Sequence, residues 1–401
     1  MSQMPSPPAA IRREDFSVSA AVAGFLAVLI SYCGPLVIFI QAAQAGGMSP
    51  AMLSSWIWAI SIGAGVSGLV LSLWLRQPII TAWSAPGTAL LLSLFPHITM
   101  AEVVGAYLMA AALVIAIGIT GTFEKIVDRI PKGIAAGMMA GILFQFGTQA
   151  FRASMELPTV VFAMLAAYLL GKRWLPRYAI VLVALTGLAV AVATGSTRLD
   201  TLALVTARPV FTAPVFDAGV FLSFTVPLLM VSLTGQYLPG MAVLRLAGYR
   251  TPSRAVVTGT GLASMLVACF GGITIVLASI TAALCTGKDA HPDAGKRYVA
   301  GVANGVFYLV GATFAGSIVL VFSAFPPALI AALAGLALIG AIVSNLALMA
   351  QDGTSTEPAV IAFLATASGM SLFGLGAAFW GVVLGMAAHG LLRVARPQTN
   401  G

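Results

Sequence analysis

The chain has 401 residues, of which 60% are hydrophobic and only 8% are charged, and its formal net charge is +8. Soluble domains carry about 25% charged residues, so this composition excludes a soluble fold and predicts a protein embedded in a lipid bilayer. The three cysteines (Cys33, Cys269 and Cys285) have no metal-ligand spacing, and we expect them to be small core residues. No metal site, cofactor or nucleotide-binding motif is expected, which argues against an ATP-driven pump.

Apolar blocks of membrane-spanning length recur along the chain from about residue 17 to residue 395. About 20 residues of helix cross the roughly 30 Å of hydrocarbon in a bilayer. The blocks predict an all-α polytopic protein with 14 transmembrane segments. These begin near residues 17, 51, 78, 101, 131, 157, 176, 218, 252, 270, 296, 326, 356 and 375.

The basic residues provide a test of this topology. If the N-terminus is cytoplasmic, all but three of the 20 Lys and Arg residues fall on the cytoplasmic side; the exceptions are Arg152, Arg198 and Arg208. Because cytoplasmic loops carry an excess of Lys and Arg, this sorting favours an even number of spans with both termini cytoplasmic. The positive charge is thus explained by topology, and no nucleic-acid partner is expected.

The third span contains a helix-starting pattern in its middle, "TAWSAPGTALLL" (81–92). Proline lacks the backbone N–H, and glycine weakens a helix interior. Ser84 is a good helix cap, and Pro86 fits the first turn. The pattern predicts a short extended segment over "QPIITAW" (77–83), followed by a helix that begins halfway across the membrane near Ser84.

The two halves of the chain resemble each other. "AGGMSP" (45–50) resembles "AGYRTP" (247–252), and "IPKGIAAGMMAG" (130–141) resembles "FPPALIAALAG" (325–335). We therefore predict two seven-span halves of opposite topology, an arrangement typical of transporters.

The third span of the second half, "VACFGGITIVLASITAAL" (267–284), is interrupted by Gly271-Gly272, and we expect its helix to begin near Thr274. The two extended segments are expected to pair with each other, and both helix N-termini to point at one region that suits an anion. The alternative is that both interruptions are simple kinks.

Several stretches carry a family resemblance: "GFLAVLISY" (24–32), "TAWSAPGTALL" (81–91), "AAGMMAGILFQFGTQAF" (135–151), "LPGMAVLRLAGY" (238–249), "ITAALCTGKDAHPD" (280–293) and "FLATASGMSLFGLGAAFWG" (363–381). The sequence resembles the bacterial benzoate:proton symporters of the BenE type, which are distantly similar to nucleobase transporters with a seven-plus-seven inverted repeat. The resemblance implies a core domain of residues 15–125 (spans 1–4) and 206–320 (spans 8–11). It implies a gate domain of residues 126–205 (spans 5–7) and 321–396 (spans 12–14).

The resemblance also places a substrate site between the two broken helices and spans 1 and 8. The implied substrate-binding residues are Tyr32, Ser84, Ala85, Pro86, Gly87, Thr88, Gln236, Tyr237, Phe270, Gly271, Gly272, Ile273 and Thr274. The family typically reads Ser-Gln-Asn where this chain has Gly235-Gln236-Tyr237, so Tyr237 is expected to line the pocket. A neutral amide such as Gln236 donates to a carboxylate without repelling it.

The proton-coupling residue is harder to locate. All twelve acidic residues map to loops or span ends, although an intramembrane carboxylate is the usual proton relay. Glu102, which opens the fourth span, is the best candidate. Alternatively, the proton travels with the substrate carboxylate.

The sequence therefore favours a secondary transporter of the bacterial inner membrane that imports benzoate or a related small aromatic carboxylate with a proton. The alternative is a uniporter or channel for small organic anions. An enzyme is not expected, because the acids and histidines are scattered rather than clustered. The oligomeric state is left open, with a homodimer as one option.

Overall fold

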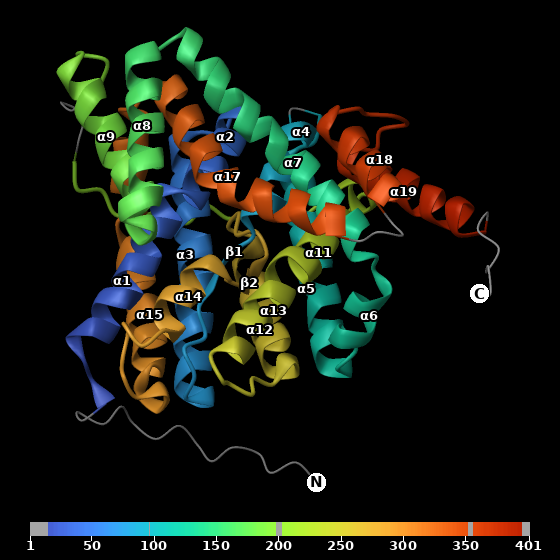
Figure 1. Ribbon diagram of the computed structural model, residues 1–401, viewed down its shortest axis with the longest axis horizontal. Helices are drawn as coiled ribbons and strands as arrows, with labels where there is room; N and C mark the ends of the chain where they lie inside the picture. Colours follow the sequence, from blue (N-terminus) through green and yellow to red (C-terminus); the bar gives the residue numbers. More distant parts are fainter. Residues whose placement is uncertain (1–14, 96, 198–202, 352–355, 395–401) are drawn as a thin grey trace.

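The protein is described from a computed structural model covering residues 15–95, 97–197, 203–351 and 356–394. The described chain is mostly helical, with one two-stranded ribbon at its centre (Figure 1). Up to residue 197, its α-helices are α1 (Val18–Cys33), α2 (Pro35–Ala45), α3 (Pro50–Leu75), α4 (Ala85–Leu94), α5 (Met100–Thr120), α6 (Phe123–Arg129), α7 (Lys132–Arg152), α8 (Pro158–Trp174) and α9 (Ala179–Ala193). The strand β1 (Thr81–Trp83) precedes α4.

A segment without helix or strand, residues 203–216, leads to a long helical stretch, Ala218–Leu246. This stretch contains α10 (Ala218–Val220), α11 (Val226–Ser232) and α12 (Leu238–Leu246). Two π-helical turns, Phe221–Thr225 and Leu233–Tyr237, interrupt this stretch. The remaining elements are α13 (Ser253–Ala268), β2 (Ile275–Leu277), α14 (Ile280–Thr286), α15 (Tyr298–Thr313), α16 (Ala315–Ser323), α17 (Pro327–Gln351), α18 (Thr356–Ala367) and α19 (Ala377–Val394).

Within the described residues, six helical stretches are long and apolar enough to cross a membrane: Val18–Ala45, Pro50–Leu75, Met100–Thr120, Lys132–Met155, Ala218–Leu246 and Pro327–Gln351. A seventh results if the pair Ala294–Thr313 and Ala315–Ser323, bent by 70°, counts as one span. The prediction of a helical polytopic membrane protein is therefore confirmed. The count of fourteen crossings stays a prediction. The chain termini, on which the predicted orientation depends, lie outside the described residues.

Helix ends follow the local sequence. Ser49 caps α3 by accepting a hydrogen bond from the N–H of Met52, and Pro50 occupies the first position of the helix. Gly34 and Pro35 separate α1 from α2, because the proline cannot donate the hydrogen bond that would continue the helix. The first long stretch is therefore interrupted as well, a break that the sequence analysis did not predict.

The helices pack in two groups (Figure 1). In the first, which we call the ribbon bundle, α3 packs against α15 and α13, α13 packs against α5, and the strands lie among them. Small residues allow close approach there; for example, a Cβ on Gly305 would come within 2.7 Å of the Gly65 carbonyl oxygen. In the second, the flanking bundle, α7 packs against α17 and α18, α18 against α19, and α8 against α9. Helices α2 and α4 lie where the bundles meet, since α2 contacts α17 and α4 contacts α7.

Candidate functional site

The two interrupted segments pair with each other. Strands β1 and β2 are antiparallel, with Thr81 opposite Leu277 and Trp83 opposite Ile275. The pairing continues past the strands, because the N–H of Ser84 donates to the Thr274 carbonyl at 3.0 Å and the N–H of Ala278 donates to the Ile80 carbonyl at 2.9 Å. Unsatisfied backbone groups cost several kcal/mol each in hydrocarbon. The predicted pairing is therefore confirmed, and it explains how extended backbone persists in an apolar interior.

Side chains fix this ribbon to its neighbours. The Thr81 hydroxyl donates to the Ala64 carbonyl of α3 at 2.7 Å. On the other strand, the Ile275 N–H donates to the Ser264 hydroxyl of α13 at 2.8 Å. Thr81, Ser264 and Ile275 are all at most 1% exposed. Each strand is thus tied to a long helix of the ribbon bundle, which holds the ribbon as a rigid platform.

Helix α4 begins where the sequence predicts. The Ser84 hydroxyl accepts a hydrogen bond from the Gly87 N–H, and the Ser84 carbonyl accepts one from the Thr88 N–H. Because Pro86 has no N–H, only the Ala85 N–H of the first turn has no hydrogen-bond acceptor among the described residues. The tip of α4 therefore offers a ligand the Ala85 N–H, the Ser84 hydroxyl hydrogen and the positive end of the helix dipole.

Helix α14 does not begin where the sequence predicts. The chain turns at Gly271 and Gly272, then Ile273 and Thr274 lead into β2, and the helix starts only at Ile280. The prediction of a helix from Thr274 is therefore wrong. Gly271 has φ +86°, and a Cβ there would overlap the Trp56 indole, so the glycines form the turn that ends α13 rather than a helix tip.

The register of the ribbon also bears on the prediction that the N-termini of α4 and α14 point at one region. Ser84 lies beside Thr274 at one end of the ribbon, whereas α14 starts beyond Ala278, which pairs with Ile80 at the other end. Ile80 and Ser84 are four positions apart along the extended chain, which corresponds to about 14 Å at 3.4 Å per residue. The two tips thus flank the ribbon from opposite ends. They do not meet at one point, and one carboxylate cannot touch both.

Helix α11 packs across the tip of α4. A Cβ on Gly87 would overlap Leu228 of α11, so the two helices touch at this glycine. Ser232 follows Leu228 by four residues on the same helix face. Its side chain is fully buried, and its hydroxyl has no hydrogen-bond partner among the described residues. The Thr274 hydroxyl is also buried, and it too has no hydrogen-bond partner among the described residues. The hydrogen bond from Ser84 places Thr274 beside the start of α4. Ser232 lies one helical turn from Leu228, the side chain that contacts Gly87.

The predicted residue Gln236 lies in the π-helical turn Leu233–Tyr237, where the helix widens by one residue. Such turns occur often at functional sites. Gln236 is half-buried, and no hydrogen bond to its amide occurs among the described residues. A Cβ on the preceding Gly235 would overlap the Met139 methyl group of α7. The π-helical turn therefore lies directly against the flanking bundle.

Tyr237 makes structural contacts inside the ribbon bundle. It is fully buried, and its hydroxyl is 2.6 Å from the Thr260 hydroxyl and donates to the Ile275 carbonyl at 3.1 Å. Its ring packs against Phe123. These contacts make Tyr237 a structural link between the π-helical turn, α13 and β2, and its contact with a ligand stays a prediction.

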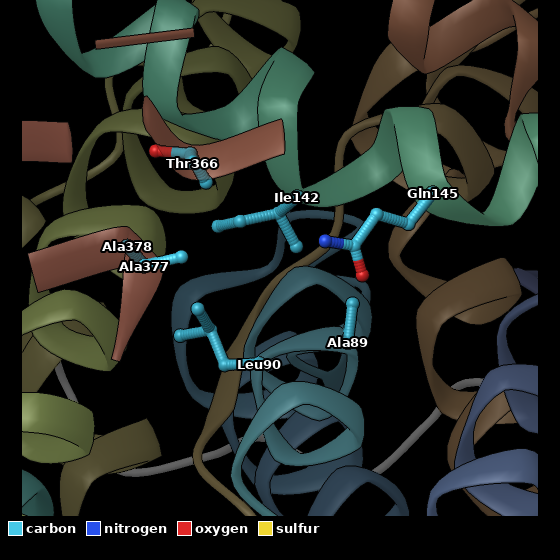
Figure 2. A pocket seen from close by; sticks show the side chains of 7 residues that line it. All are labelled: Ala89, Leu90, Ile142, Gln145, Thr366, Ala377 and Ala378. Carbon is cyan, nitrogen blue, oxygen red and sulfur yellow. The ribbon is translucent and has the colours of Figure 1, made fainter. Parts of the chain in front are cut away.

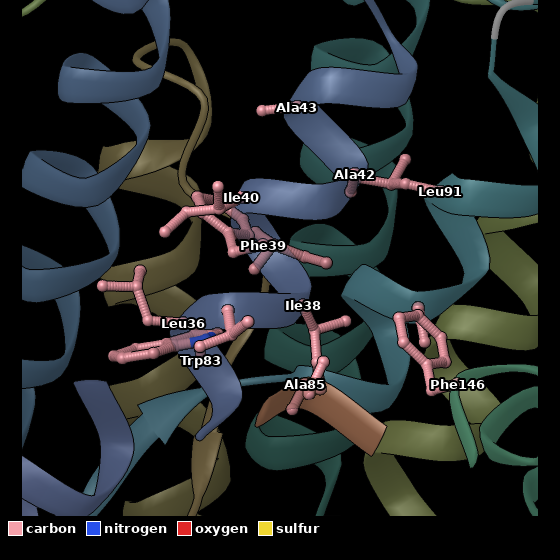
Figure 3. Packing of buried hydrophobic residues seen from close by; sticks show 14 of the residues in the cluster. Leu36, Ile38, Phe39, Ile40, Ala42, Ala43, Trp83, Ala85, Leu91 and Phe146 are labelled. Carbon is pink, nitrogen blue, oxygen red and sulfur yellow. The ribbon is translucent and has the colours of Figure 1, made fainter. Parts of the chain in front are cut away.

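Tyr32 belongs to an aromatic cluster on the ribbon. Its ring stacks on Trp83 with centroids 6.1 Å apart, and Tyr308 of α15 packs edge-on against both rings. The Tyr32 hydroxyl is hydrogen-bonded to Ser61 at 2.8 Å. Figure 3 shows Trp83 beside Leu36 of α2, with Ala85 next to Ile38. Phe270 is elsewhere, in the turn after α13, where its ring contacts Trp58 and Phe211.

Glu102 serves a capping function. Its carboxylate accepts hydrogen bonds from the Thr99 N–H and hydroxyl, both at 2.7 Å, which completes a capping box at the start of α5. Its proton-coupling function stays a prediction. No group of three or more His, Cys, Asp or Glu side chains that could hold a metal ion occurs among the described residues.

Trp83, directly before Ser84, and Ser232, on α11, were not predicted as site residues. Trp83 appears only within the predicted extended segment, and Ser232 has no predicted role. Alternation along a strand could have pointed to Trp83, because it shares the Thr81 face. The four-residue spacing from Leu228 could have pointed to Ser232 only if the contact of Leu228 with Gly87 had been known.

Comparison with known proteins decides the family. Residues 14–391 match the family "BenE: Benzoate membrane transport protein". The chain belongs to the BenE family. It is 54% identical over 380 residues to the "Benzoate membrane transport protein" of Acinetobacter baylyi, covering 95% of this chain and 96% of that protein. It is 38% identical over 373 residues to "Inner membrane protein YdcO" of Escherichia coli, covering 93% and 95% of the two chains. The BenE chain is thus a multi-pass membrane transporter and not an enzyme.

Two solved structures have a fold similar to that of this chain. The transmembrane domain of the cyanobacterial bicarbonate transporter BicA aligns with a TM-score of 0.60 at 18% identity, over 96% of this BenE chain and 99% of that domain. SLC26A9 aligns with a TM-score of 0.65 at 13% identity, over 97% of this chain and 67% of the other. At these identities, the likeness concerns the fold alone.

Proposed function

We propose that this BenE protein imports benzoate or a related small aromatic carboxylate together with a proton, by alternating access. The observation that carries the proposal is the α4 tip, a polar helix end held inside an apolar protein by the paired ribbon. The tip suits a carboxylate, and the rings of Trp83, Tyr32 and Tyr308 nearby are typical of a site for an apolar ring. The name of the Acinetobacter relative supports the choice of benzoate.

The proposed binding residues are those around the α4 tip. The carboxylate accepts from the Ala85 N–H and the Ser84 hydroxyl, with Gly87 allowing the close approach of α11 and Thr88 completing the turn. Gln236, Ser232 and Thr274 supply further donors. Removing any single donor is expected to weaken binding, since a hydrogen bond to a charged group contributes about 1.5–3 kcal/mol.

The proposed moving parts are a core domain of residues 15–125 and 206–320, and a gate domain of residues 126–205 and 321–396. The ribbon bundle corresponds to the core, and the flanking bundle to the gate. The contact of Gly235 with Met139 and that of α4 with α7 cross between them. Separation of these contacts on one side of the membrane would open the site to that side.

The proposed topology is fourteen spans as a seven-plus-seven inverted repeat, in the bacterial inner membrane, with both termini cytoplasmic. Helix contacts support the repeat. The contact of α3 with α15 joins proposed spans 2 and 11, and that of α13 with α5 joins spans 9 and 4, which are the same pair after the halves are exchanged. The antiparallel ribbon joins spans 3 and 10 in the same symmetric way.

The test is uptake of labelled benzoate into proteoliposomes that contain the purified full chain. With a proton gradient directed inward, we expect benzoate to accumulate above its external concentration, and collapse of the gradient to abolish the accumulation. A uniporter or channel would only equilibrate benzoate, and that result would replace the symport proposal with the alternative.

Two variants test the position of the site. Ser84→Leu and Gln236→Ala are expected to abolish uptake while leaving membrane insertion and the elution volume of the purified protein unchanged. Normal uptake by both would exclude the α4 tip as the site. Gln149→Leu, on α7, is the matched control, because Gln149 has no part in the proposed site.

A further inference from the structure

A small cavity lies between α4 and three helices of the flanking bundle (Figure 2). It is lined by Ala89 and Leu90 of α4, Ile142 and Gln145 of α7, Thr366 of α18 and the start of α19. Its volume is about 10 Å³, which is close to the lower limit for one water molecule. The cavity is therefore a small, partly open space at the contact between the two bundles, lined by apolar side chains together with Gln145 and Thr366.

Gln145 supplies the polar group of this cavity. Figure 2 shows its amide pointing into the space between Ala89 and Ile142, whereas the Thr366 oxygen points away. The Gln145 Nε2 donates to the Ala367 carbonyl at 3.4 Å, at the long end of the range for a hydrogen bond, and no other hydrogen bond to this side chain occurs among the described residues. The amide thus keeps an acceptor oxygen and a donor hydrogen available.

The cavity lies at a defined distance from the α4 tip. Ala85 and Ala89 are four residues apart and so occupy the same face of α4, about 6 Å apart along the helix axis. Helix α7 contacts α4, and Gln145 of α7 reaches toward Ala89 in Figure 2. A carboxylate bound at the tip, with its ring lying along this face, would bring the opposite edge of the ring to Gln145.

We propose that this cavity is the subsite for the ring edge opposite the carboxylate, and that Gln145 determines which para substituent is accepted. The inference rests on the proposed function and adds a specificity-determining residue from the flanking bundle. With benzoate, the cavity holds one water molecule on the Gln145 amide. A para hydroxyl replaces this water and donates to Oε1, whereas a para methyl group leaves Oε1 without a hydrogen-bond donor.

The test compares dissociation constants measured by isothermal titration calorimetry on the purified full chain. The ligands are benzoate, 4-hydroxybenzoate, 4-methylbenzoate and, as a positional control, 2-hydroxybenzoate. In Gln145→Leu, we expect the preference for 4-hydroxybenzoate relative to benzoate to fall about tenfold, as for the loss of one buried hydrogen bond. The relative affinity for 4-methylbenzoate should rise, and that for 2-hydroxybenzoate should not change.

Two further variants allow the subsite to be tested even if Gln145→Leu does not fold. Ala89→Val fills the cavity from the opposite wall, so both para-substituted acids should weaken relative to benzoate. Gln149→Leu makes the same chemical change one turn away and should leave all ratios as in the natural protein. If benzoate binds but neither Gln145→Leu nor Ala89→Val changes the ratios, the subsite is refuted while the proposed function stands. If the natural protein binds none of these acids, the proposed function fails, and the subsite with it.

Discussion

The ribbon joins two chain segments, which we call the first arm (β1 and α4) and the second arm (β2 and α14), and each changes from strand to helix in a different way. The first arm passes directly from β1 into α4, a helix of ten residues with a serine cap and a proline in its first turn. The second arm turns at two glycines, runs through β2 and only then forms α14, a helix of seven residues without a side-chain cap. The comparison teaches that a cap residue followed by proline marks a helix start, whereas paired glycines mark a turn. The first arm is thus the better-defined anion site.

The largest expected effect tests the turn in the second arm. In Gly271→Ala, the alanine must keep a φ of +86°, and its Cβ overlaps the Trp56 indole. We therefore expect a loss of about 3 kcal/mol in the free energy of unfolding. Gly374→Ala is the matched control, because its φ is +74° but nothing lies within 4 Å. It should lose only about 1 kcal/mol. Equal losses, measured by denaturant unfolding in detergent, would show that the contact with Trp56 contributes nothing.

A slightly smaller effect is expected in the first arm. Gly87→Val places a branched side chain against Leu228 and the Ser84 hydroxyl, which should cost about 2 kcal/mol and reduce benzoate uptake more than tenfold. Gly390→Val in α19 meets nothing within 4 Å and should leave uptake unchanged. Wild-type uptake by the Gly87 variant would show that the contact between α4 and α11 is not needed.

The two serines before the helices provide the sharpest comparison. Ser84→Ala removes a side-chain cap and should destabilise the protein by about 1 kcal/mol. Ser279→Ala removes no cap hydrogen bond, so its thermal unfolding midpoint should match that of the natural protein. If Ser279→Ala lowered the thermal unfolding midpoint more than Ser84→Ala, the conclusion that only the first arm has a side-chain cap would be wrong.

These differences indicate how much the sequence could reveal. The α4 start was predictable because its signal is local: Ser84 and Pro86 act within one turn. The pairing of the extended segments was predictable from backbone hydrogen bonding, since unpaired strands are too costly in a membrane. The late start of α14 was not predictable, because Gly271 is needed only once Trp56 of another helix packs on it. The structural contacts of Tyr237 were not predictable for the same reason, as its partners Thr260 and Ile275 come from later elements.

The smallest expected effect concerns the outer ends of the arms. Asp15 accepts hydrogen bonds from Tyr298, which follows the second arm, at 2.8 Å and from Arg76, which precedes the first, at 3.2 Å. The Tyr298 hydrogen bond and the positive charges of Lys296 and Arg76 lower the pKa of Asp15 below its ordinary value. The stabilisation is therefore present at neutral pH and is lost as the pH falls through this lowered pKa.

The Asp15→Asn variant provides the corresponding measurement. The natural protein should lose a small part of its thermal stability on acidification, and the variant should lack that part at every pH. Parallel melting curves for the two proteins from neutral to acidic pH would contradict the assignment.

The ribbon also determines when the chain can finish folding. Strand β1 leaves the ribosome long before residues 275–277 exist, so its hydrogen bonds to β2 cannot form during that interval. Until then, residues 77–83 must find temporary partners, such as water, the translocation machinery or lipid headgroups. An N-terminal fragment that ends before β2 would therefore keep this segment exposed. Synthesis of the second half completes the interior of the first.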